Sequence, residues 1–202
     1  MYRSAHLEVV AGLVEQHIPI YEAGQWDPVE AARTGRGSCF SKNVFGAIIL
    51  EVVADLNTAT AISWGEKQHP KPPTGFMLDL TRKRAGHSSL LVGTAGQPHH
   101  VRQLSFNERY RRSDEWHIYE FNDPDDTPNA VYANKTIVAT DAGRLAGLHI
   151  HPWYEAGRAY TEALGRDDTV FHRMTQETIR EIVLDTVKVD ALPRQIPKTR
   201  PA

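Results

Sequence analysis

Cysteine is nearly absent from this chain, since Cys39 is the only one in 202 residues. A single cysteine cannot form an internal disulfide, so we do not expect a disulfide-stabilised secreted domain, and a reducing compartment fits. No apolar run approaches the roughly 20 residues that cross a bilayer. Residues 1–8 contain no apolar core of signal-peptide length. We therefore expect a cytoplasmic protein without a membrane partner.

Net charge is also small, because 23 Lys and Arg residues stand against 25 Asp and Glu residues, which leaves −2. This balance gives no electrostatic reason to expect binding to nucleic acid or to an anionic membrane. Two short basic runs, residues 82–84 and 109–112, lack interleaved aromatic side chains, and we interpret them as solvated turns. A hydrophobic content of 41% and a charged content of 24% are ordinary for a soluble globular protein.

The first quarter of the chain predicts mostly helix. Residues 4–17 place apolar side chains at helical spacing. Asp27 followed by Pro28 is typical of the start of a short helix, with Asp as the cap. A third apolar helical repeat follows Cys39 and reaches about residue 56.

The remainder predicts strands and then helices. Thr175 is the expected cap of a final helix, and a further helix is expected over 153–164. We therefore predict an α+β fold in one compact domain, with a helical part over 1–57, a β-rich part with the C-terminal helix over 58–192, and a flexible tail. Extended segments are predicted at 58–64, 76–80, 87–93, 99–106, 115–121 and 135–140, and the tail at 193–202.

The sole cysteine lies where a helix is expected to begin. Gly35 and Gly37 allow a tight loop just before it, and Ser38 is a suitable N-cap. Cys39 then falls in the first turn, where free N–H groups and the helix dipole lower the pKa of a thiol. We predict that Cys39 is a nucleophile. The alternative is a small buried side chain without chemistry.

A thiol nucleophile needs a base, which is usually histidine. His87 follows a glycine and opens an apolar strand. A sheet packed on the cysteine helix would bring the start of this strand to Cys39, so we predict His87 as the base. Without the cysteine, His87 would be interpreted as a surface histidine at a strand edge.

These motifs resemble those of arylamine N-acetyltransferases. Residues 37–43, Gly-Ser-Cys-Phe-Ser-Lys-Asn, are similar to their cysteine motif, and residues 86–92, Gly-His-Ser-Ser-Leu-Leu-Val, to their histidine strand. Residues 116–121 resemble their strand of tryptophan followed by Tyr-x-Phe. The resemblance implies a papain-like fold of the transglutaminase superfamily, in which a helix carries the nucleophile and an antiparallel sheet or barrel follows.

The resemblance also implies the chemistry. Cys39 would take an acyl group from acyl-CoA, such as acetyl-CoA, and an amine acceptor would then attack the thioester on Cys39. No metal is expected in such a site. The basic turn just before His87 suggests that Arg82 and Arg84 bind the phosphates of CoA.

The third member of the site departs from the family pattern. The family places an aspartate on the return strand to orient the histidine, and Arg102 stands at that position here. A cation there would oppose an imidazolium and lower the pKa of the histidine. Gln103 or Asp79 are the substitutes that we predict as orienting residues, with Asp114 and Glu115 lying farther along the chain.

Three other functions remain open. A degenerate relative would keep the fold as a binding module, for which Arg102 is the argument. A transglutaminase-like or protease-like enzyme would act on an amide of a protein or peptide. A metal site would use His149 and His151, whose i, i+2 spacing places both rings on one face of a strand, with Glu155 or Asp141 as a further ligand.

Overall fold

The computed structural model describes residues 4–64, 85–93, 100–106, 117–120, 130–141, 144, 148–163, 165 and 170–188. The predicted strand over 76–80 and the predicted tail over 193–202 lie outside these residues. Within the described part of the chain, no helix is both long and apolar enough to cross a membrane.

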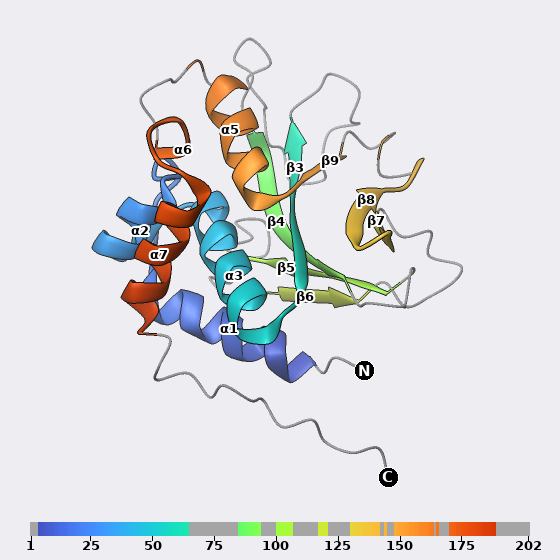
Figure 1. The fold of residues 1–202 in the computed structure, drawn as a ribbon, viewed down its shortest axis with the longest axis horizontal. Coiled ribbons are helices and arrows are strands. Elements are labelled where there is room, and N and C mark those ends of the chain that lie inside the picture. The colour runs from blue at the N-terminus through green and yellow to red at the C-terminus, as the bar shows by residue number, and fades with distance from the viewer. Residues whose placement is uncertain are drawn as a thin grey trace, which may run out of the picture.

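The helices form one side of the molecule, with the cysteine helix α3 (Cys39–Ala54) at their centre. Figure 1 shows α3 between the sheet on one side and α2 and α7 on the other. Eleven consecutive residues of α3, from position 40 to position 50, are buried, because the helix has neighbours on nearly every side. The other helices are α1 (Ser4–His17), α2 (Pro28–Thr34), α5 (Trp153–Ala163), α6 (Val170–Arg173) and α7 (Gln176–Val187).

The main sheet has five strands in the order β6-β5-β4-β3-β9, and every neighbouring pair is antiparallel. The predicted hairpin of a histidine strand and a return strand is confirmed as β4 paired with β5. Together with the helices, this sheet confirms an α+β fold. The strands are β3 (Asn57–Trp64), β4 (Ala85–Gly93), β5 (Val101–Ser105), β6 (His117–Glu120) and β9 (Leu148–His151).

Two small sheets complete the described part of the fold. β1 (Ile20–Tyr21) pairs in parallel with β2 (Arg36–Gly37), just before the cysteine helix. β7 (Ala130–Ala133) and β8 (Thr136–Ala139) form a hairpin. Its two turn residues, Asn134 and Lys135, have φ of 48° and 63°, as a two-residue hairpin turn of the primed type requires. Sequence patterning predicted only the second strand of this hairpin.

Capping side chains define three helix starts as predicted. Asp27 Oδ1 accepts hydrogen bonds from the backbone N–H groups of Val29 and Glu30 at the start of α2. Thr175 caps α7, and Ser38 caps α3. These caps satisfy N–H groups that a helix leaves without intrahelical partners.

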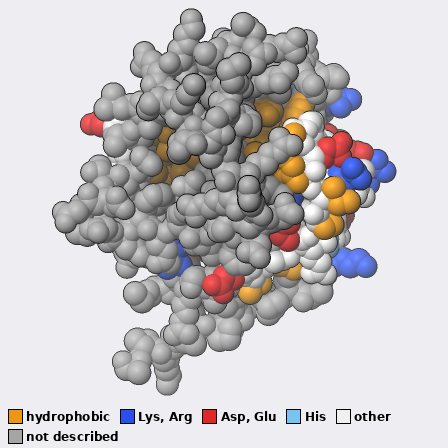
Figure 2. Space-filling model, turned by 180° about the vertical axis from the view of Figure 1, so that it is seen from behind, with side chains coloured by type: hydrophobic (Ala, Val, Ile, Leu, Met, Phe, Trp, Pro, Cys, Tyr) orange, Lys and Arg blue, Asp and Glu red, His pale blue; other side chains and the backbone are white. Residues whose placement is uncertain are grey.

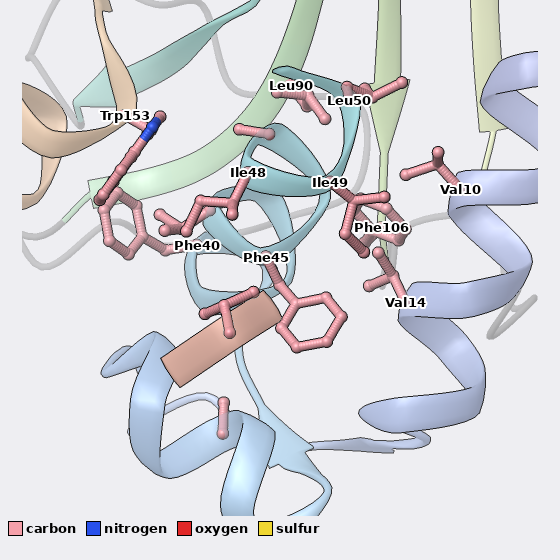
Figure 3. Close-up of a cluster of buried hydrophobic side chains, with 14 of the residues drawn as sticks. Val10, Val14, Phe40, Phe45, Ile48, Ile49, Leu50, Leu90, Phe106 and Trp153 are labelled. Carbon is pink, nitrogen blue, oxygen red and sulfur yellow. The ribbon is translucent and has the colours of Figure 1, made fainter. Parts of the chain in front are cut away.

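The core has two clusters, one on each face of the main sheet. The larger one lies around α3, where Val10 and Val14 of α1 point toward Ile49 and Phe106 (Figure 3). It includes side chains from Leu7 to Val187, and so joins the helical part to the sheet. The smaller cluster joins the opposite face of the sheet to the β7–β8 hairpin through Ala61, Leu91, Val101, Tyr132 and Ile137.

The described surface carries charges of both signs. Seen from behind, Lys and Arg side chains lie interspersed with Asp and Glu side chains along one edge (Figure 2). This mixing agrees with the net charge of −2.

Candidate functional site

Cys39 is the first residue of α3, as the sequence predicts. The Oγ of Ser38 accepts a hydrogen bond from the backbone N–H of Ser41 at 3.4 Å. Cys39 itself is half-buried. A thiol in this first helical turn experiences the positive end of the helix dipole, which favours the thiolate.

Buried polar side chains surround Cys39 along the chain. Ser38, Ser41, Lys42 and Asn43 are each at most 3% exposed. The Oγ of Ser41 lies 3.0 Å from the carbonyl oxygen of Gln25 and 3.1 Å from that of Ser38. Such groups are costly to bury unless they are hydrogen-bonded. Their concentration at the start of an otherwise apolar helix therefore distinguishes this end of α3.

Lys42 contributes a fully buried charge to this region. Its Nζ lies 2.9 Å from both carboxylate oxygens of Glu15 on α1, and its side chain is 0% exposed. A cation near a helix N-terminus opposes the helix dipole, and the carboxylate of Glu15 offsets that repulsion. The bond joins α1 to the first turns of the cysteine helix.

The two loop glycines serve the packing of this region. Gly35 ends α2 in the left-handed conformation, with φ of 69°, which favours glycine. A Cβ on Gly37 would lie 2.5 Å from Ser41 Oγ and 2.9 Å from Ile18 Cγ2, so only glycine fits between these groups. Local geometry therefore explains the glycine loop, and the residues that point to a function are Cys39 and the polar side chains near it.

The helix and β4 run side by side in the same direction. Asn43 Nδ2 donates to Ser88 Oγ at 2.9 Å. One turn later, a Cβ on Gly46 would lie 3.3 Å from Leu90 Cδ2. Cys39 shares this helix face, because residues four apart lie one above the other. Extending the contacts back by one turn places Cys39 level with the start of β4, near positions 86 and 87.

The described side chains of β4 alternate between the two faces of the sheet. Ser88 and Leu90 face α3, whereas Ser89 and Leu91 have the opposite parity and Leu91 belongs to the smaller cluster. The side chain of His87, the predicted base, lies outside the described residues. The level of the β4 backbone suits a Cys39–His87 pair.

A β-bulge lies next to this position. His87 pairs with Ser63, but the next pair joins Trp64 to Ala85, so Gly86 is an extra residue on β4. A bulge breaks the alternation of a strand and redirects the neighbouring side chains. Glycine is the residue that best tolerates such a backbone.

The residues predicted around the acid position lie away from Cys39. Arg102 pairs with Val92 and is buried on the α3 face, level with the C-terminal half of α3. Gln103 lies on the opposite face, where its Nε2 donates to Ser89 Oγ at 2.9 Å. Neither residue faces the helix end that carries Cys39. Five further residues that the sequence suggested lie outside the described residues: Asp79, Arg82, Arg84, Asp114 and Glu115.

The two histidines of β9 lie on one face of the sheet, as their spacing predicts. His149 pairs with Ile62 and His151 with Thr60. Burial lowers the pKa of His151; the charge of His149 lowers it further, and Glu155 opposes this shift. Among the described side chains, no group of three or more His, Cys, Asp or Glu residues could hold a metal ion. The described geometry therefore gives the metal hypothesis no support.

Sequence patterning missed the polar contacts that fix the start of α3. The ion pair between Lys42 and Glu15 and the bond between Asn43 and Ser88 each join distant segments. The available signal was the run Ser41-Lys42-Asn43 inside a helix that is otherwise apolar. Three consecutive polar residues cover more than half of a helix circumference, so some of them had to be buried.

No protein-family model, no curated protein and no solved structure matches the chain. The chemistry of the site is therefore inferred from its residues alone.

Proposed function

We propose that this chain is a cysteine-dependent acyltransferase in which Cys39 is the nucleophile. The observation that carries the proposal is the position of a half-buried thiol at the first residue of a capped helix, among buried polar side chains. The helix N-terminus stabilises the thiolate, and its free N–H groups are suited to hold an oxyanion.

The proposed reaction has two steps. The thiolate of Cys39 attacks the carbonyl carbon of an acyl-CoA thioester, such as acetyl-CoA, and the thiolate of CoA leaves and is protonated. A neutral amine then attacks the acyl group on Cys39, the C–S bond breaks, and an amide forms. His87 accepts the proton from the thiol in the first step and the proton lost by the amine in the second.

The proposed base is supported by the level of β4 against α3 and by the adjacent bulge. β4 begins beside the turn of α3 that carries Cys39, and Gly86 breaks the strand alternation just before His87. A papain-like arrangement, with a helix-borne cysteine packed on an antiparallel sheet, is the finer fold that we propose on the same grounds. Arg82 and Arg84 are proposed as contacts for the phosphates of CoA.

Intact mass spectrometry after incubation with acetyl-CoA or a longer acyl-CoA tests the proposal. We expect one acyl adduct, absent from Cys39→Ser, which an added amine removes as the amide appears. Release of the acyl group as the free acid, with no amide formed, would favour the transglutaminase-like or protease-like alternative. A native protein that forms no adduct with any acyl-CoA would overturn acyl transfer.

The proposed CoA contact has its own experiment. Replacing Arg82 and Arg84 together by Gln is expected to raise the acyl-CoA concentration needed for half-maximal acylation of Cys39. The rate with a small thioester that lacks the nucleotide serves as the control and is expected to stay unchanged. An unchanged acyl-CoA dependence would rule out the contact.

A non-catalytic binding module is the second candidate. One observation favours it: Arg102 stands where the orienting acid was expected. The rate at which iodoacetamide labels Cys39 near pH 6 to 7 separates the candidates. Fast labelling that slows in His87→Ala supports the enzyme, whereas slow labelling indifferent to that change supports the binding module.

A further inference from the structure

Asn43 carries a buried polar atom that the described part of the chain does not use. Its side chain is 0% exposed, and its Nδ2 donates to Ser88 Oγ at 2.9 Å. Its Oδ1 is buried as well, and no group in the described part of the chain donates a hydrogen bond to it. The bond to Ser88 therefore fixes the amide between α3 and β4 and leaves one acceptor oxygen over.

An acceptor in this state calls for a reason. A buried oxygen without a donor is costly, and native proteins keep few of them. A leucine has the same branched shape as asparagine and would fill this place without burying an amide. Unpaired groups that persist commonly serve a catalytic role or a bound molecule. We therefore looked for a donor that Asn43 Oδ1 could receive from a ligand.

The acceptor lies one helical turn from the thiol of Cys39. Asn43 and Cys39 share the face of α3 that packs on β4. Helical side chains lean toward the N-terminus of their helix, so Asn43 covers the turn that carries Cys39. The Cβ atoms of residues four apart are about 5–6 Å from each other. Because Cys39 is half-buried, a molecule that reaches its thiol from solvent also comes close to Asn43.

The reacting groups of acyl transfer differ in what they can offer to this oxygen. The thioester carbonyl, the oxyanion formed from it and the departing thiolate of CoA carry no hydrogen on their reacting atoms, so Oδ1 cannot accept a bond from them. The acceptor amine is the reactant whose reacting atom carries N–H groups. A fixed amide oxygen beside Cys39 therefore suits the second step of the reaction, in which the amine attacks.

Resting on the proposed acyl transfer through Cys39, we propose that Asn43 Oδ1 binds the attacking nitrogen and selects a primary amine. As the C–N bond forms, the C–S bond breaks and its electron pair stays on the sulfur of Cys39. One N–H proton of the amine passes to that thiolate, and the second N–H remains in the amide product and donates to Oδ1 throughout. A secondary amine has one N–H, which it loses in the reaction, so it cannot keep this bond.

Two isomeric amines test the proposal in the native chain. Propylamine is primary and N-methylethylamine is secondary, and both have the same atoms and similar basicity. Cys39 is first acylated with acetyl-CoA or with p-nitrophenyl acetate, and intact mass spectrometry then follows removal of the acyl group by each amine. We expect the ratio of the primary to the secondary rate to exceed by about tenfold the ratio for a small acetyl thioester in solution. A protein ratio equal to the solution ratio would overturn the proposal.

A matched pair of variants assigns the preference to Oδ1. Ser88→Ala keeps the oxygen but no longer fixes the amide, so we expect the amine ratio to fall partly. Adding Asn43→Leu to Ser88→Ala keeps the shape, removes the oxygen and leaves no hydroxyl unpaired, so we expect the ratio to reach the solution value. A double variant that keeps the native ratio would overturn the role of Asn43. If urea denaturation shows that the double variant does not fold, the native ratio and its decrease in Ser88→Ala still decide.

These outcomes can be separated from those of the proposed function. If only p-nitrophenyl acetate acylates Cys39, transfer from CoA fails and the amine ratio still tests Asn43. If acetyl-CoA acylates Cys39 and the ratio ignores Asn43, the acceptor role fails alone. The amide nearest the sulfur of CoA also carries an N–H group. Slower acylation by acetyl-CoA in the double variant than in Ser88→Ala, with an unchanged amine ratio, would assign Oδ1 to that amide and overturn the acceptor role. A native chain that neither donor acylates overturns both proposals.

Discussion

Lys42 is fully buried, and its ammonium lies 2.9 Å from both carboxylate oxygens of Glu15. The two partners differ in burial, because 24% of the Glu15 side chain is exposed. Removing the carboxylate therefore leaves a cation in the core, whereas removing the lysine leaves a carboxylate that water reaches. Breaking a buried pair is strongly destabilising mainly through the charge left behind.

We predict that Glu15→Gln lowers the free energy of unfolding by about 3 kcal/mol or more, and that Lys42→Met costs clearly less. Urea denaturation of both variants measures the difference. The exposed pair of Arg33 and Glu30 offers a control, since Glu30→Gln should leave the urea midpoint unchanged. A larger loss for Lys42→Met than for Glu15→Gln would contradict the argument.

Gly37→Ala is predicted to disturb the start of the cysteine helix. The new Cβ would lie 2.5 Å from Ser41 Oγ and 2.9 Å from Ile18 Cγ2, and 3.1 Å from Ala31 Cβ. We expect a lower melting temperature together with altered labelling of Cys39, because Ser41 belongs to the first turn of α3. Gly12→Ala is the matched control: its Cβ meets nothing within 4 Å inside α1. It should stabilise the protein by about 0.5–1 kcal/mol.

Gln103→Ala tests whether the sheet face opposite α3 affects the reactivity of Cys39. Its amide bonds to Ser89 Oγ on the face opposite α3, so the change should cost about 1 kcal/mol of stability. The pH profile of Cys39 labelling should stay as in the wild type. A shifted profile would restore Gln103 as the orienting residue that the sequence suggested.

Local signals in the sequence predicted much of the fold. Asp27, Ser38 and Thr175 cap helices where expected, because capping depends on residues within one turn. The position of Cys39 at the first residue of α3 followed from the same kind of signal.

The relation between Cys39 and His87 could not be predicted in this way. It depends on the pairing of β4 with β3 and on the extra residue Gly86, which involve segments far apart in the chain. A shift of one residue moves a strand position to the other face of a sheet. The residue types at and beside position 87 do not indicate that register. The sequence could therefore suggest that the histidine strand begins beside Cys39, but not which face of the sheet position 87 occupies.

Stability is predicted to depend on the protonation of His151. Burial lowers the pKa of its imidazole below the ordinary value of 6.5, and the neighbouring charge of His149 adds to this. As pH falls below about 6.5, the imidazole of His151 takes up a proton in the unfolded chain before it does so in the folded chain. The stability that is present above about pH 6.5 is therefore lost as pH falls. We expect a lower free energy of unfolding at about pH 5.5 than at about pH 7.5.

Three variants check that assignment. His151→Gln should remove this difference in the free energy of unfolding between the two pH values. His149→Gln should make the difference smaller, because it removes a charge that repels a proton on His151. Glu155→Gln should steepen it, because the carboxylate of Glu155 raises the pKa of His151 and so opposes the shift. Urea denaturation at both pH values gives the comparison, and an unchanged slope in His151→Gln would assign the pH dependence to other groups.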